Sequence, residues 1–86
     1  MKIGLRLYGF DELVPILGGK ELEILFEGHT YGDLIHHLGE KYGDAVAKLL
    51  RQQVIRNSRQ WIPGNELGFL LEDGDRLMFI PMMGGS

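Results

Sequence analysis

The stretch that decides the fold lies at the end of the chain, where residues 70–81 read LLEDGDRLMFIP and residues 82–86 read MMGGS. An Asp-Gly turn leads into a run in which Leu77 and Phe79 alternate with residues of the opposite parity, the pattern of a strand with one buried face. We therefore predict a final strand that ends the folded domain at Pro81.

The residues after this strand are typical of a tail rather than of a packed element. Glycine loses more backbone freedom on ordering than any other residue and has no side chain to bury, so Gly84 and Gly85 add little to a core. When extended, residues 82–86 reach roughly 15 Å. We expect a folded domain at 1–81 and a flexible tail at 82–86 that delivers the Gly85 carboxylate, once exposed, to another protein's active site.

Length and charge limit the classes of function that are open to the chain. Its 86 residues suit one small domain, and 12 acidic against 9 basic residues leave a net charge of −3 without a Lys/Arg cluster. Nucleic acid is therefore not an expected partner. No apolar run suits a secretory signal or a membrane span, so we expect no membrane association and a cytoplasmic location. The sequence has no cysteine, which excludes disulfides and thiol chemistry.

Two more strands are expected in the first part of the chain, at 2–8 and 21–27, because apolar and polar residues alternate there. Residues 9–20 between them are expected to form a loop, since Pro15 and the Gly18-Gly19 pair interrupt any regular pattern. The two strands should form an antiparallel hairpin. Their inward residues are Ile3, Leu5, Leu7, Leu22, Ile24 and Phe26.

The apolar period then becomes helical. Thr30 is a suitable N-cap with Asp33 three residues later, and a second helical segment is expected from Asp44, after Gly43. Short extended pieces are expected at 53–56 and 60–62, joined by a turn. The inward helical residues are Tyr31, Leu34, Ile35, Leu38 and Tyr42 in the first segment and Val46, Leu49 and Leu50 in the second.

A hairpin, a helix and a returning strand pack most economically as an α+β domain, with one main helix on one face of a mixed sheet. The last strand should lie beside the first and parallel to it, because a crossover that contains the helix joins them. This arrangement is the ubiquitin-like β-grasp.

The end of the chain carries a family resemblance. Its leucine, Asp-Gly-Asp turn, alternating strand, proline and Gly-Gly resemble the ubiquitin-like sulfur carriers, and most of all the small subunit of molybdopterin synthase, the MoaD-like proteins. The opening strand, the helix from Thr30 and residues 70–85 fit this pattern. The long segment 9–20 favours a MoaD-like protein over ThiS, the more compact carrier of the thiamine pathway.

The resemblance implies a carrier rather than an enzyme. An adenylating enzyme of the ubiquitin-activating type would use ATP and Mg²⁺ to activate the carboxylate of Gly85, and a sulfur donor would convert it to a thiocarboxylate. The sulfur would then pass to a pterin precursor in the large subunit of molybdopterin synthase. The chain itself would hold no cofactor or catalytic residue. Two alternatives remain open, a protein modifier joined to lysines through Gly85 and a non-covalent β-grasp adaptor.

Ser86 departs from the family pattern, because a peptide bond from Gly85 to Ser86 leaves no carboxylate at the required atom. Three explanations are open: a protease removes Ser86, the serine was left by cloning, or the carrier function has been lost. The flexible side chains of Met82 and Met83 suit a tail that adapts to a partner groove.

An outward apolar patch is expected on the sheet. Leu25, Met78 and Ile80 have outward parity, and Tyr8 adjoins them, so these residues could dock the activating enzyme and the synthase large subunit. The alternative is that a bulge changes the parity or that another segment covers the patch.

Other chemically suggestive residues have simpler interpretations. His29, His36 and His37 lack further ligands for a metal and are interpreted as solvated, and the Gly18-Gly19 pair as a turn. Glu21, Glu23 and Glu27 are interpreted as the wet face of a strand. Trp61 is interpreted as a core or loop anchor, since no basic groove accompanies it.

Overall fold

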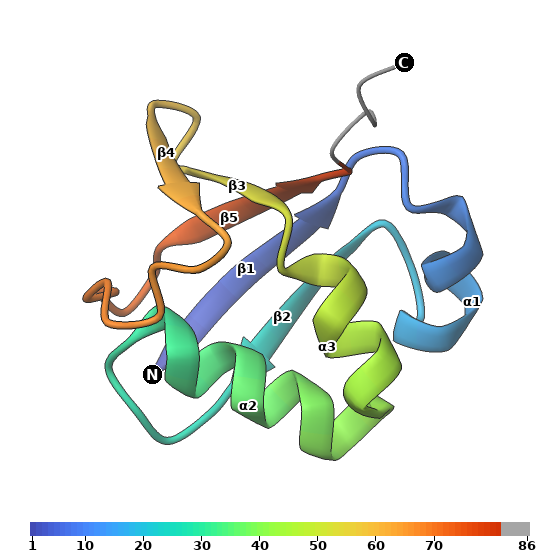
Figure 1. Cartoon of the computed structure of the whole chain (residues 1–86), viewed down its shortest axis with the longest axis horizontal. Coiled ribbons are helices and arrows are strands. Elements are labelled where there is room, and N and C mark those ends of the chain that lie inside the picture. The colour runs from blue at the N-terminus through green and yellow to red at the C-terminus, as the bar shows by residue number, and fades with distance from the viewer. Residues whose placement is uncertain (82–86) are drawn as a thin grey trace.

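Strands from both ends of the chain meet in the middle of one sheet in the computed structural model, which describes residues 1–81 (Figure 1). The sheet order is β2-β1-β5-β3-β4, with β1 and β5 parallel and the other neighbours antiparallel. This mixed sheet confirms the predicted α+β, ubiquitin-like β-grasp. Expectations about residues 82–86 lie outside the described part. The strands are β1 (Lys2–Leu7), β2 (Glu21–Leu25), β3 (Gln53–Arg56), β4 (Gln60–Pro63) and β5 (Arg76–Ile80).

The main helix, α2 (Tyr31–Tyr42), begins at the predicted cap. The Thr30 hydroxyl accepts from the amide of Asp33 at 3.1 Å, and the Asp33 carboxylate accepts from the amides of Thr30 at 3.2 Å and His29 at 3.0 Å. These bonds satisfy donors that a helix start leaves free. They also hold the pKa of Asp33 below its ordinary value, with the bond from His29 as the largest cause.

The second helix, α3 (Asp44–Leu50), also forms as predicted, but its inward stripe differs. Val46, Ala47 and Leu50 are buried, whereas Leu49 is 39% exposed, so the expectation that Leu49 faces inward is wrong. The cause is the close approach to α2 at Gly39, where an added Cβ would lie 3.5 Å from the Cβ of Ala47. This approach turns the Ala47 side of the helix inward.

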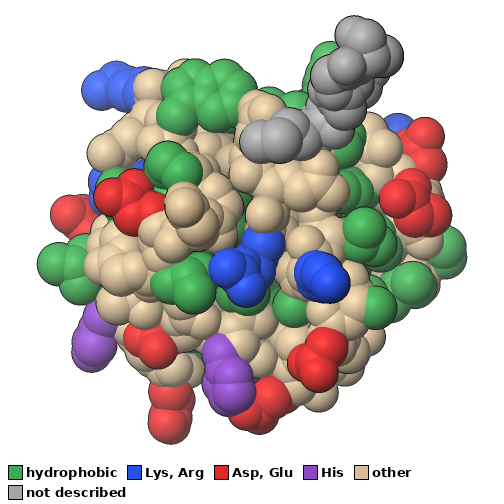
Figure 2. All heavy atoms as spheres, in the orientation of Figure 1, with side chains coloured by type: hydrophobic (Ala, Val, Ile, Leu, Met, Phe, Trp, Pro, Cys, Tyr) green, Lys and Arg blue, Asp and Glu red, His purple; other side chains and the backbone are tan. Residues whose placement is uncertain are grey.

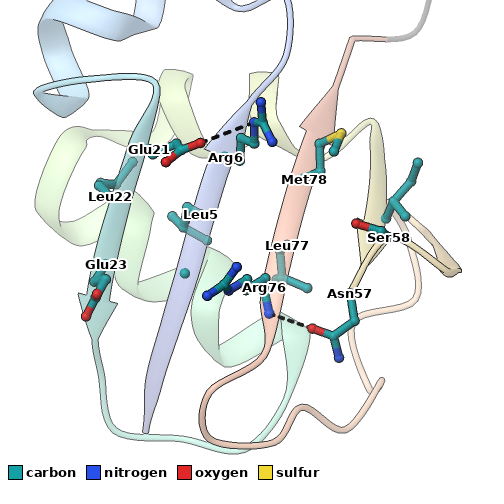
Figure 3. A pocket seen from close by; sticks show the side chains of 12 residues that line it. Leu5, Arg6, Glu21, Leu22, Glu23, Asn57, Ser58, Arg76, Leu77 and Met78 are labelled. Atoms are coloured by element: carbon teal, nitrogen blue, oxygen red, sulfur yellow. Dashed lines mark hydrogen bonds and ion pairs between the residues drawn. The ribbon is translucent and has the colours of Figure 1, made fainter.

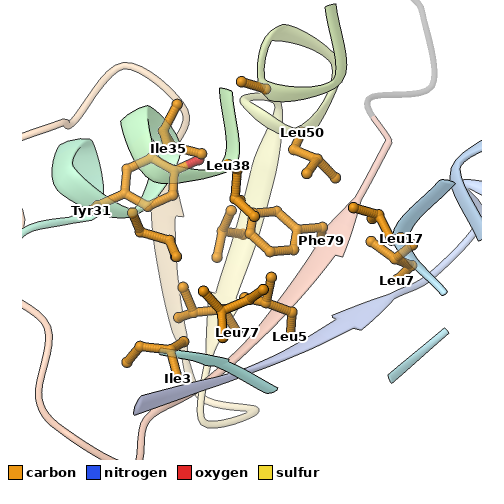
Figure 4. Close-up of a cluster of buried hydrophobic side chains, with 14 of the residues drawn as sticks. Ile3, Leu5, Leu7, Leu17, Tyr31, Ile35, Leu38, Leu50, Leu77 and Phe79 are labelled. Carbon is orange, nitrogen blue, oxygen red and sulfur yellow. The ribbon is translucent and has the colours of Figure 1, made fainter. Parts of the chain in front are cut away.

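The core lies between the helices and one face of the sheet (Figure 4). Tyr31 and Leu38 project from α2 toward Leu5 of β1 and toward Leu77 and Phe79 of β5, and all five side chains are at most 2% exposed. Burying a side chain of this size contributes roughly 1.5–3 kcal/mol. The inward parity predicted for β1 and β5 is therefore confirmed, and it fixes which residues of β5 face outward.

The segment between β1 and β2 is more ordered than predicted. It contains a 3₁₀ turn, η1 (Asp11–Leu13), and a one-turn helix, α1 (Val14–Leu17). Pro15 stands in the first turn of α1, where a missing amide hydrogen does no harm, and Gly18 ends the helix with φ +94°. The expectation of a loop throughout 9–20 is therefore wrong. Three buried side chains attach the segment to the core: Phe10, Leu13 and Leu17.

Candidate functional site

The tail begins from the central strand of the sheet. The predicted tail residues Met82, Met83, Gly84 and Gly85 lie outside the described residues, but β5, which leads to them, is hydrogen-bonded to β1 on one side and to β3 on the other. The amide of Tyr8 also donates to the carbonyl of Phe79 at 2.9 Å. The end of β5 is therefore held on both sides.

The face of the sheet that the helices leave uncovered carries a group of apolar side chains. Ile55 of β3 pairs with Trp61 of β4 on one side and with Met78 of β5 on the other. Ile80 follows two residues after Met78, on the same face of β5. We call these four residues, Ile55, Trp61, Met78 and Ile80, the apolar sheet patch.

The structure brings together three of the four predicted docking residues. Met78 and Ile80 are half-buried within the patch, and Tyr8, which is 63% exposed, follows β1 beside Ile80. Leu25 is 75% exposed but pairs with Lys2, at the opposite end of the sheet. Its outward parity is as expected, but the antiparallel register of the hairpin separates it from the others.

Sequence reasoning missed the part of the patch contributed by β3 and β4. Trp61 is 58% exposed on the sheet face, so its interpretation as a core or loop anchor is wrong. The available signal was the alternation around Val54 and Ile62, which are both buried, because it turns Ile55 and Trp61 outward. That these two residues adjoin Met78 depends on strand order, which no local pattern records.

Beside the patch, the sheet face is hollowed into an open depression of about 640 Å³ (Figure 3). Gly4 contributes no side chain to its floor, and Met78 connects it to the apolar sheet patch. Two ion pairs neutralise charges across β1 and β2, between Arg6 and Glu21 at 3.4 Å and between Lys2 and Glu23 at 2.8 Å. The outward glutamates of β2 are thus partners of basic residues. The depression is suited to a partner surface, because its rim combines both charges with apolar side chains.

A buried carboxylate holds the start of β5. Asp75, which is 5% exposed, accepts from Arg56 at 2.7 and 3.3 Å, from the Asn57 side chain at 3.1 Å and from the amide of Glu72 at 2.8 Å. Burial alone would raise the pKa of Asp75, but these hydrogen bonds outweigh it and hold the pKa below its ordinary value. Asn57 also accepts from the amide of Arg76 at 2.9 Å (Figure 3). The network thus joins β5 to the β3–β4 turn.

The helices offer less to a ligand. His36 is exposed beside Glu40, and the ring of His37 lies 6.0 Å from that of Phe26. Within residues 1–81, no three metal-binding side chains gather, and no helix is long and apolar enough to cross a membrane. Acidic, basic, histidine and apolar side chains are intermixed over the face drawn in Figure 2. The sheet face and the end of β5 therefore remain the candidate site.

Comparison with known proteins identifies one family and several similar structures. The model of the ThiS family matches residues 9–85, whereas no curated protein matches the sequence. SAMP1 from Haloferax volcanii, a small archaeal modifier protein, superposes with a TM-score of 0.70 at 19% identity, covering 100% of both chains. These values indicate a shared fold.

Two further structures have the same fold at 19% identity. A chain of the BexX/CysO complex from Amycolatopsis orientalis superposes with a TM-score of 0.66, covering 98% of this chain and 99% of that one. A Pyrococcus furiosus protein described as a molybdopterin converting factor, subunit 1, gives 0.63, covering 94% and 97%. The family match extends through both tail glycines and stops before Ser86.

Proposed function

We propose that this chain, which belongs to the ThiS family of ubiquitin-fold sulfur carriers, carries sulfur as a thiocarboxylate on Gly85. The observation that supports the proposal most is the combination of a family match that ends at Gly85 with a tail that begins from the central strand β5. A firmly held strand gives the tail a fixed origin, and the glycines keep it thin enough for a narrow active site.

The chemistry takes place in two steps on a partner enzyme. The Gly85 carboxylate attacks the α-phosphorus of ATP, which releases pyrophosphate and forms an acyl-adenylate. A sulfur nucleophile from the donor then attacks the carbonyl carbon, and AMP leaves with the bonding electrons. The partner, an adenylating enzyme of the ubiquitin-activating type, holds ATP and Mg²⁺. Because the step needs ATP, we place the carrier in the cytoplasm.

Ser86 must be absent for this chemistry, because only a terminal Gly85 has a free carboxylate. We propose that a protease removes it. In this scheme Met82 and Met83 lie in the partner's groove, where flexible thioether side chains adapt to its shape.

The apolar sheet patch and Tyr8 are proposed to dock the partner. Trp61 and Tyr8 expose large apolar surfaces at 58% and 63%, and aromatic side chains of this kind supply much of the energy of protein interfaces. The patch lies along β5, so a protein bound there would have the start of the tail beside it. The same surface would serve the adenylating enzyme and the sulfur acceptor in turn.

We propose the large subunit of molybdopterin synthase as the acceptor. The long segment 9–20 and the fold shared with the Pyrococcus furiosus protein favour this acceptor over one of the thiamine pathway.

A chain of residues 1–85 tests the carrier proposal directly. Incubated with ATP, Mg²⁺, sulfide and a purified adenylating enzyme of the ubiquitin-activating type, it should release pyrophosphate and become retarded on a mercury-containing gel that detects thiocarboxylates. Full-length 1–86 and a chain ending at Gly84 are matched controls and should remain unchanged. If 1–85 also stays unchanged with an enzyme that activates another ThiS-family carrier in the same assay, the proposal fails.

A protein modifier is the second candidate, because the fold is shared with SAMP1 over the whole chain. In that case an amine rather than sulfur would attack the acyl-adenylate. Arg76 is the last basic residue, so trypsin would leave residues 77–85 attached to the modified lysine. Lysine peptides carrying this branch in native cells would support the modifier, whereas thiocarboxylate without such peptides would support the carrier alone. A partner that still binds a chain without Gly84 and Gly85 would support the non-covalent adaptor.

A further inference from the structure

The tail starts beside a glycine that leaves no room for a side chain. Gly9 follows β1 and has φ +96°, and a Cβ added there would lie 3.1 Å from Cγ and 3.3 Å from Cδ of Pro81. Both distances are tighter than ordinary van der Waals contact, so a side chain at residue 9 would have to displace the Pro81 ring. Pro81 is the last residue before the tail.

The chain around Pro81 has little freedom to compensate for such a displacement. The proline ring fixes its own φ and restricts Ile80 to extended conformations. Two residues earlier, the carbonyl of Phe79 accepts from the amide of Tyr8 at 2.9 Å. A push on the ring must therefore change the direction in which the chain continues.

We propose that Gly9 is a positioning residue, which lets Pro81 close onto the end of β1 and thereby sets the direction in which the tail leaves the domain. The inference rests on the proposed function, because this direction matters only if Gly85 must reach a partner's active site. A displacement of a few tenths of an ångström at the ring grows along residues 82–85, which extend over roughly 13 Å. It becomes on the order of 1 Å at Gly85, enough to lower the rate of a positioned reaction up to roughly 100-fold.

The chain contains a matched control for the strain of a positive φ. Gly18 has φ +94°, nearly the same as Gly9, but nothing lies within 4 Å of an added Cβ. Gly9→Ala and Gly18→Ala therefore impose the same backbone strain, and only the first meets Pro81. Differences between the two variants report the contact itself.

A spin label tests the direction of the tail without any partner. The sequence has no cysteine, so Met83→Cys provides a unique labelling site just after Pro81. The label broadens the amide resonances of nearby domain residues. We expect Gly9→Ala to change which resonances are broadened and Gly18→Ala to leave the pattern as in the parent. If Gly9→Ala also keeps the parental pattern, the inference is overturned.

Kinetics of adenylation test the functional consequence, using chains that end at Gly85. Gly9→Ala should lower kcat roughly tenfold or more while KM for the carrier stays within about twofold, because docking uses the sheet face. Gly18→Ala should change neither. Equal kinetics for the two variants contradict the inference. If the parent is not adenylated, the proposed function fails, and the spin label still decides the direction of the tail. Should Gly9→Ala not fold, Gly9→Asn replaces it, because asparagine tolerates positive φ.

Discussion

Replacing Tyr31 by phenylalanine should stabilise the domain. The Tyr31 side chain is 0% exposed among aliphatic side chains of the core, and its hydroxyl has no hydrogen-bond partner within the described residues (Figure 4). An unsatisfied buried hydroxyl costs roughly 1–3 kcal/mol. The space left by one oxygen atom returns part of this as lost packing, so we expect Tyr31→Phe to raise the free energy of unfolding by roughly 0.5–2 kcal/mol.

Urea unfolding followed by circular dichroism at pH 7 measures this change. With a slope of about 1–1.5 kcal/mol/M for a domain of this size, the midpoint should rise by roughly 0.5–1.5 M. Tyr8→Phe is the control, because Tyr8 is 63% exposed and its hydroxyl reaches water, so its midpoint should hardly move. A Tyr31→Phe variant that is less stable than the parent would refute the reasoning, since it would mean that the hydroxyl is hydrogen-bonded in solution.

The advantage of Tyr31→Phe should grow at high pH. Burial raises the pKa of Tyr31 from 10.0 to about 12, against a smaller opposing effect of Arg51. The unfolded chain therefore loses this proton first, and the parent loses stability as the pH rises from 10 toward 12. The loss approaches roughly 2–3 kcal/mol. Phenylalanine has no proton to lose, so a difference that stays constant between pH 8 and pH 11.5 would contradict the buried position of the hydroxyl.

Three further predictions concern the sheet. Ser58→Gly should raise the free energy of unfolding in urea by roughly 0.5–1 kcal/mol, because Ser58 has φ +60° in an exposed turn where glycine is unstrained, and a lower midpoint would exclude this explanation. Asp75→Asn should lower that free energy by roughly 2–4 kcal/mol, since it breaks a buried pair with Arg56. The parent should lose this contribution in acid, as the pH falls below 3.8 through the depressed pKa of Asp75, so the difference should shrink there; a difference independent of pH would count against the ion pair. Trp61→Ala should raise KM for the adenylating enzyme roughly tenfold or more with little effect on stability, whereas Leu25→Ala, equally exposed but at the other end of the sheet, should not; equal effects would argue against docking at the apolar sheet patch.

Local patterns in the sequence predicted the elements, because each depends on neighbouring residues. Alternation placed β1, β2 and β5, and the bonds between Thr30 and Asp33 placed the start of α2. The helical turn at α1 escaped prediction because the glycines at 18 and 19 suggested a loop, although the spacing of Phe10, Leu13 and Leu17 is that of a helical stripe.

The candidate site was harder to predict, because it depends on which strands become neighbours. Parity correctly turned Leu25 and Met78 outward, but only the register shows that they lie at different ends of the sheet. The same register brings Ile55 and Trp61 next to Met78. The contact between Gly9 and Pro81 joins residues far apart in the sequence, so no local motif could reveal it.

The central place of β5 has a mechanical consequence. A pull on the tail loads a strand whose ladder bonds to β1 and β3 run across the direction of the force, so the bonds are sheared together instead of being peeled one at a time. Breaking many bonds at once requires a larger force than breaking them in succession. The domain should therefore withstand extraction of its tail from one enzyme's grip and be ready, still folded, for the next.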